Sequence, residues 1–287
     1  MAIIGALAAG LGAGGLYAVI GVCLVLMATL TRVINFSQVA VGVYAAFLAI
    51  RFVPLGVPPW GIVLIALIVG AAVSALLGWI IATWLPEATG TARSAVTVAG
   101  LLFLLSISYL QFGTRPQALV PLVSGPLVSF GVVTITRLSL ALILLAIALA
   151  VFSKLVLTKT PLGVQLRAIS DRQTAAELIG INVKVLQIGV WAFTGAVMAL
   201  AISFAGNSQA ANAGVMVNLI IPGAAAALIG AFKRLDLAII GGILLGGIQG
   251  LLTAIPSINL LRDWIPIIII VIFLLWSQRK EVWDVAR

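Results

Sequence analysis

The sequence contains no histidine, one cysteine and few charged residues, and each of these shortages excludes a class of protein. The absence of histidine excludes His-based catalysis, His metal sites and His proton relays. The single cysteine, Cys23, lies within an apolar run, so we expect neither a disulfide framework nor a cysteine metal site. Only 8% of the 287 residues are charged, against about 25% in soluble domains, which excludes an ordinary globular enzyme.

Apolar residues, by contrast, make up 63% of the chain, and the mean hydropathy is +1.30. A hydrocarbon core about 30 Å thick takes roughly 20 apolar residues per helix, so this length allows about eight to ten crossings. The sequence therefore predicts an all-α polytopic membrane protein, with residues 1–287 forming a single transmembrane domain. No positive charge precedes the first apolar stretch, which argues against a cleavable signal peptide.

Apolar runs bounded by charges, proline or glycine predict nine transmembrane helices. They cover about residues 4–30, 36–53, 60–83, 95–112, 137–157, 185–205, 215–232, 237–256 and 260–277. The longest hydrophilic connection covers residues 158–184, and we expect it in the cytoplasm.

The basic residues carry an orientation signal. Sixteen Lys and Arg against seven Asp and Glu give a net charge of +9, but the basic residues stand singly between apolar runs. That pattern is typical of loop charges that orient helices and not of a nucleic-acid surface. With residues 158–184 inside, only Arg51, Arg115, Arg137 and Arg262 of the 16 basic residues fall outside. The positive-inside rule thus predicts the N-terminus outside and the C-terminus inside.

All seven acidic residues fall in predicted loops or within about one turn of a predicted helix end. Proton-coupled carriers need groups that ionise inside the membrane, and intramembrane hydrolases need a carboxylate, histidine or metal to activate water. Both classes are therefore disfavoured. A pathway without fixed charge suits a small neutral or zwitterionic solute, whose carboxylate could be met by backbone N–H groups at a broken helix end.

Polar residues near two points of weak helix continuity are candidates for the solute pathway. They are Asn35, Ser37, Gln38 and Tyr44 around the second span, and Asn218 ahead of Pro222 in the seventh. Pro222 removes a backbone hydrogen bond, and interrupted segments in corresponding positions of two halves indicate a transport site. The alternative is that these residues only cap helix ends or bridge neighbouring helices.

A row of small residues in the eighth span, Gly242, Gly246 and Gly250, forms a double GxxxG pattern. In lipid, such a face lets two helix backbones approach closely and pack. The partner of this face is either another helix of the same bundle or a second subunit.

The connection of residues 158–184 begins with the signals of a short amphipathic helix. Thr160 is a good N-cap and Pro161 occupies the first helical position. Leu162, Leu166 and Ile169 then recur at i, i+4 and i+7.

A second short helix is predicted directly afterwards. Ser170 and Gln173 have the spacing of a capping box, and Gly180 supplies a left-handed stop. Two helices are more than a connector needs, so we expect this loop to dock a partner. The alternative is a helix that lies on the lipid headgroups with its basic residues toward anionic lipid.

The second helix carries a recognisable motif. Residues 174–180, Thr-Ala-Ala-Glu-Leu-Ile-Gly, resemble the EAA motif of ATP-binding cassette (ABC) importer permeases, with Thr174 where the motif has Glu. The segments Thr160-Pro-Leu-Gly, Gly15-Leu-Tyr-Ala-Val-Ile-Gly-Val, Val33-Ile-Asn-Phe-Ser and Gly42-Val-Tyr extend the likeness. Through most of its length the chain resembles the branched-chain amino acid permease family of the LivH type.

This resemblance implies a permease subunit of an ABC importer in the inner (plasma) membrane of a prokaryote, passing branched-chain amino acids or similar small solutes. It implies separate ATPase subunits that bind ATP, and the sequence itself has no GxxxxGK[ST] motif. No cofactor or metal is expected in the chain. The alternative from another class is a self-sufficient secondary carrier or channel for a small neutral solute.

The resemblance also implies where partners bind. In that family the loop carries a coupling helix seated in a groove of the ATPase, and the corresponding docking positions here are Ala175, Ala176 and Gly180, with Glu177 and Arg167 as polar neighbours. A second permease subunit, related or identical, and surrounding lipid complete the membrane part. An extracytoplasmic solute-binding protein would contact outer connections, with Asn207, Gln209 and Asn212 as candidates.

Overall fold

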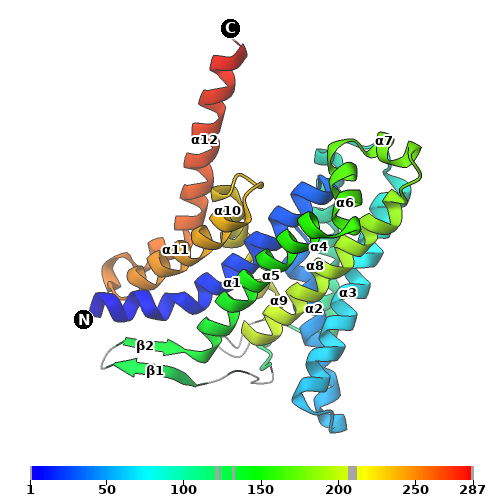
Figure 1. Cartoon of the computed structure of the whole chain (residues 1–287). Helices are drawn as coiled ribbons and strands as arrows, with labels where there is room; N and C mark the ends of the chain where they lie inside the picture. The colour runs from blue at the N-terminus through cyan, green and yellow to red at the C-terminus, as the bar shows by residue number, and fades with distance from the viewer. Residues whose placement is uncertain (1, 120–122, 124, 131–132, 206–211, 286–287) are drawn as a thin grey trace.

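The computed structural model describes the chain except residues 1, 120–122, 124, 131–132, 206–211 and 286–287 (Figure 1). Within the described part, seven helices are long and apolar enough to cross a membrane. They are α1 (Ala2–Thr31), α2 (Gln38–Ala49) continued by the 3₁₀ helix η1 (Ile50–Leu55), α3 (Pro59–Trp84), α4 (Gly90–Phe112), α5 (Arg137–Lys159), α8 (Val183–Ala205) and α11 (Leu235–Thr253). The chain is therefore a polytopic all-α membrane protein.

The remaining predicted spans take a different form. The 3₁₀ helix η2 (Pro256–Asp263) and α12 (Ile265–Val285) are bent by 54° and give an eighth crossing if they form one span. The predicted span 215–232 is not a continuous helix, because α9 (Ala213–Val217) and α10 (Ile220–Ile229) are separated by a break. The break precedes the expected position: Pro222 lies in the first turn of α10, where a backbone N–H would have no intrahelical partner.

The surface of α3 indicates how the bundle faces lipid. Its buried residues recur about every four positions, from Ile62 to Gly78, while Ile68 on the other face is 67% exposed. Trp60 and Trp84, near its two ends, are both exposed. At about 1.5 Å per residue these tryptophans stand about 36 Å apart, close to the spacing of the two aromatic belts of a membrane protein.

The core is built around α1, whose residues from 14 to 27 are all buried. The glycine row of α11 lies against this helix: a Cβ at Gly246 would be 2.3 Å from the Cα of Gly14, and one at Gly250 would be 2.8 Å from the Cα of Gly10. The two backbones are thus in direct contact, as a small-residue face allows. Within the chain, the partner of the row is α1.

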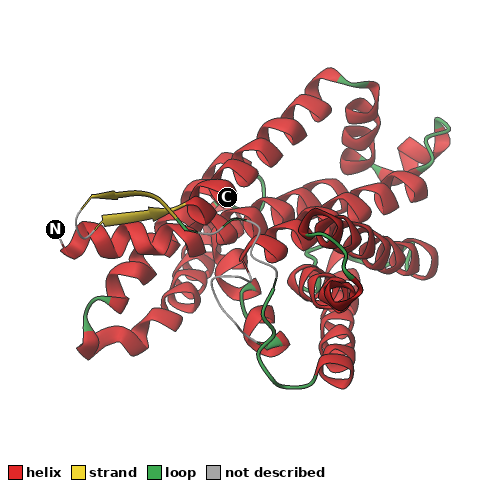
Figure 2. Cartoon of the chain, turned by 90° about the horizontal axis from the view of Figure 1, so that it is seen from below, coloured by secondary structure: helices red, strands yellow, loops and turns green. Residues whose placement is uncertain are grey.

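The two ends of the bundle differ. Strands β1 (Pro126–Phe130) and β2 (Val133–Thr136), which the sequence did not predict, form an antiparallel hairpin beside the N-terminal part of α1 (Figures 1 and 2). We call this the hairpin end. The short helices α6 (Pro161–Asp171) and α7 (Gln173–Leu178) lie at the opposite, α7 end, toward which α12 also extends.

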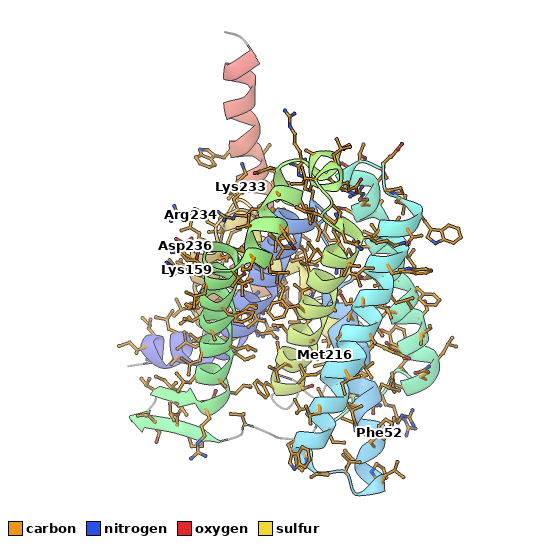
Figure 3. All side chains as sticks on the ribbon, turned by 45° about the vertical axis from the view of Figure 1, so that its right-hand side comes forward. Phe52, Lys159, Met216, Lys233, Arg234 and Asp236 are labelled. Carbon is orange, nitrogen blue, oxygen red and sulfur yellow. The ribbon has the colours of Figure 1, made fainter. Side chains whose placement is uncertain are left out.

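Two basic residues mark the α7 end. Figure 3 shows Lys233 and Arg234 toward the α7 end and Phe52 toward the hairpin end. Arg234 forms an ion pair with Asp236, with 2.6 Å between Nη2 and Oδ2, in the first turn of α11. A carboxylate at a helix N-terminus is also favourably placed in the helix dipole.

Candidate functional site

The loop between α5 and α8 begins as expected. The hydroxyl of Thr160 accepts a hydrogen bond of 3.1 Å from the N–H of Gly163, and Pro161 occupies the first position of α6. Leu166 and Ile169 are buried, whereas Leu162 is 46% exposed. The helix thus rests on the bundle through its middle and its last turn.

The capping box predicted from Ser170 and Gln173 is wrong. Arg172 is the N-cap of α7 and forms no side-chain cap bond, while the Ser170 hydroxyl donates to the carbonyl of Thr29. That carbonyl is one of the last four of α1, which have no partner within their own helix. The serine therefore satisfies a helix end that is distant in the sequence.

The stop at Gly180 has the expected left-handed conformation, with φ at +85°. The N–H of Ile181 donates to the carbonyl of Ala176 at 3.0 Å, which is the six-residue bond of a Schellman turn. A Cβ at Gly180 would meet nothing within 4 Å. The requirement for glycine is therefore set by the backbone and not by space.

This difference gives a prediction. Gly180→Val should loosen the end of α7, because a β-branched residue in this conformation costs about 1–2 kcal/mol, whereas Gly180→Asn should be tolerated. Amide hydrogen exchange of residues 173–183 in the purified chain measures the effect. Equal exchange in the two variants would show that the left-handed turn does not hold the helix.

The side chains of α7 divide between the bundle and the solvent. Ala176 is buried against Ile169 and Val183, so its side chain supports the turn from beneath. Leu178 is 84% exposed and Ile179 is 74% exposed. We call this exposed pair the α7 tip.

The α7 tip is not among the docking positions predicted from the sequence. The available signal was the pair of large apolar residues directly before the glycine stop. Of the predicted docking positions, Arg167, Ala175 and Glu177 are exposed beside this tip or on the neighbouring helix.

The polar residues at the start of α2 form a buried network. Asn35, Ser37 and Gln38 are each 0% exposed. Asn35 Nδ2 donates to Gln38 Oε1 at 2.8 Å, Ser37 Oγ donates to Asn35 Oδ1 at 2.6 Å, and Gln38 Nε2 donates to the carbonyl of Thr194 at 2.8 Å. The structure uses these side chains to join α2 to α8. Tyr44 is half-buried, with its ring edge-on to Phe112.

A polar cavity of about 580 Å³ lies elsewhere, between α1, the α9–α10 break, α11 and the η2–α12 bend. Of the predicted pathway residues only Asn218, at the break, lines it. The other polar lining residues are Tyr17, Gln249, Thr253, Arg262 and Asp263. The hydroxyl of Tyr17 donates to Gln249 Oε1 at 2.7 Å, and Gln249 Nε2 donates to the carbonyl of Arg262 at 3.1 Å.

The charges of this cavity cancel. Arg262 and Asp263 form an exposed ion pair of 3.2 Å. The other polar side chains of the lining are uncharged, with the hydroxyls of Tyr17 and Thr253 and the amides of Asn218 and Gln249. Such a lining can accommodate a small solute that is neutral or carries one charge of each sign. Tyr17 and Gln249 were missed by the sequence analysis, although Gln249 is the one amide in the run 237–256.

The outer connection proposed to contact a binding protein is only partly described. Asn207 and Gln209 lie outside the described residues. Asn212 is the N-cap of α9: its Oδ1 accepts from the N–H of Val215 at 3.0 Å, and its Nδ2 donates to the carbonyl of Thr114 at 3.3 Å. Its amide thus fixes the start of the broken pair.

Comparison with known proteins supplies a family. The chain matches the family described as branched-chain amino acid transport system/permease component over residues 6–275. No curated protein matches the chain. The matched range includes both the cavity and the loop that carries α6 and α7.

Proposed function

The chain belongs to the permease family of branched-chain amino acid transport systems, and we propose that it is the membrane-spanning subunit of an ATP-driven importer. The observation that carries the coupling role is the α7 tip, an apolar pair on a tightly closed turn at one end of the bundle. Exposed apolar groups of this kind are typical of protein contact surfaces. A separate ATPase subunit would bind the ATP and dock on α6–α7.

The polar cavity is the proposed solute route. Its lining combines apolar walls with the amides of Asn218 and Gln249 and a balanced ion pair. This supports a zwitterionic solute with an apolar side chain, which is the chemistry of a branched-chain amino acid. The break between α9 and α10 supports the assignment, because interrupted helices in transporters lie at substrate sites.

The proposed topology has nine crossings, with the N-terminus outside and the C-terminus in the cytoplasm. It counts the α9–α10 pair and the η2–α12 pair as one crossing each. Two features support it. An odd number of crossings places the two termini at opposite ends of the bundle, as they lie in Figure 1. The basic residues also concentrate toward the α7 end, as the positive-inside rule requires of a cytoplasmic end. A second permease subunit, a solute-binding protein at the hairpin end and an inner-membrane lipid environment complete the proposal.

Co-isolation tests this function. When the tagged chain is extracted gently from native membranes, an ATPase, a second permease subunit and a solute-binding protein should accompany it. Proteoliposomes containing this complex should accumulate a radiolabelled branched-chain amino acid only with ATP on the ATPase side. Uptake by the purified chain alone, driven by an ion gradient, would instead establish a secondary carrier.

The cavity assignment makes its own prediction. Gln249→Leu should lower ATP-driven uptake about tenfold, because it removes an amide from the route and leaves the Tyr17 hydroxyl without its acceptor, a cost of about 1–3 kcal/mol. Tyr17→Phe should have a smaller effect in the same direction. Gln187→Leu is the matched control, since Gln187 is equally buried on α8 but does not line the cavity. Equal losses in the two Gln variants would contradict the route.

A further inference from the structure

Arg32, directly after α1, joins two parts of the molecule that are distant in the sequence. Its Nε donates to the carbonyl of Ser170 at 2.9 Å, and its Nη2 donates to the carbonyl of Asp171 at 2.7 Å. The Ser170 hydroxyl in turn donates to the carbonyl of Thr29 in the last turns of α1. The C-terminal ends of α1 and α6 are therefore held together from both sides.

The chemistry of this contact is specific. The last carbonyls of α6 have no partner within the helix and carry its partial negative charge, so a cation there is favoured. Arginine offers several N–H groups in a fixed fork and can contact two carbonyls at once, which the point charge of lysine cannot do equally well. We call this contact the Arg32 clamp.

The backbone at Arg32 is held in an unfavourable conformation. Its φ is +54°, in the left-handed region where most residues with a side chain lose about 1–2 kcal/mol. Its carbonyl also lies against the first residue of α4, because a Cβ at Gly90 would be 2.7 Å from it. Glycine would suit this backbone better, so the presence of arginine points to a use for its side chain.

The clamp also connects the loop to the cavity. Tyr17, which lines the cavity, lies on α1, whose last residue, Thr31, directly precedes Arg32. Tyr17 is 14 residues before Thr31, about 21 Å along the helix axis. Residues 18–27, Leu30 and Thr31 are buried in the core, and a continuous packed helix moves as one body. A displacement of α6 would therefore be transmitted through α1 to the wall of the cavity.

We propose that Arg32 is a positioning residue that transmits movement of the coupling loop to α1, and so to the solute route. This inference rests on the proposed function, since it requires an ATPase that moves α6. Arg32 itself contacts neither the solute route nor the α7 tip. Its loss should therefore separate ATP hydrolysis from transport without removing either docking or the cavity.

The test uses the intact complex in proteoliposomes and measures solute uptake per ATP hydrolysed. Arg32→Gly removes the clamp and also relieves the strain of the left-handed backbone, so the chain should melt no lower than the wild type. The variant should still bind its ATPase. Solute uptake per ATP hydrolysed should fall about tenfold. Arg32→Lys should recover part of the ratio, because it restores the charge without the fork. Lys233→Ala is the control, since it removes one positive charge from an exposed site at the same end of the bundle, outside α6–α7.

A second measurement examines the clamp without the partner. In the purified full chain, Arg32→Gly should speed amide exchange over residues 161–171, and Lys233→Ala should not. Unchanged exchange would show that there is no clamp, and faster exchange with unchanged uptake per ATP would reduce Arg32 to a local support. If the wild-type complex shows no ATP-dependent uptake, the proposed function and the transmission role fail together, while exchange still decides whether Arg32 holds α6.

Discussion

Gly246→Leu should prevent the bundle from folding, whereas Gly247→Ala, one residue later, should leave it intact. A Cβ at Gly246 would lie 2.3 Å from both the Cα and the N of Gly14, so the collision is with backbone that cannot rotate away. Separating α1 from α11 along this seam should cost about 3 kcal/mol or more. A Cβ at Gly247 meets only the Cδ2 of Leu7, at 3.4 Å.

Size-exclusion chromatography and thermal melting in detergent measure this difference. Gly246→Leu should lose the monodisperse peak, Gly246→Ala should melt several degrees lower, and Gly247→Ala should match the wild type. A normally melting Gly246→Leu chain would show that the contact with α1 is not required for the fold. The glycine row would then be better explained as an interface with a second subunit.

The long helices could be predicted from the sequence because a membrane leaves the chain little choice. Backbone groups in hydrocarbon must bond within their own segment, so an apolar run of sufficient length has to be helical. The predicted spans 60–83 and 137–157 therefore lie within a few residues of Pro59–Trp84 and Arg137–Lys159. Apolar length, however, does not determine where a helix breaks, and the break falls at Asn218–Leu219, before the proline that suggested it.

Parts of the candidate site could likewise be predicted from the sequence, and other parts could not. The Thr160 cap and the Gly180 turn are encoded within a few residues, so the local sequence predicts both. The cavity was not predictable, because Tyr17 and Gln249 are 232 residues apart and meet only after α1 and α11 have packed. The true partner of Ser170 is likewise 141 residues away, and no local pattern indicates it.

Leu178→Asp should weaken docking of the ATPase about 100-fold while leaving the fold unchanged. The side chain is 84% exposed, so the substitution should alter the free energy of unfolding by no more than about 0.5 kcal/mol. At the proposed interface the same change removes an apolar contact and adds a carboxylate that must be desolvated. Together these should raise the dissociation constant about 100-fold, which corresponds to about 2.7 kcal/mol.

Binding of the purified ATPase to the chain in nanodiscs measures this constant, with Leu260→Asp as the matched control. Leu260 is 89% exposed but lies in η2, far along the chain from α7, so its substitution should not change ATPase affinity. If Leu178→Asp binds the ATPase as tightly as the wild type, the α7 tip is not the docking surface. A spin label attached at Leu178→Cys then tests whether α7 lies on the lipid headgroups instead. A helix on the headgroups would place the label within reach of lipid-soluble oxygen. A docking surface exposed to water would leave the label accessible to polar relaxation agents.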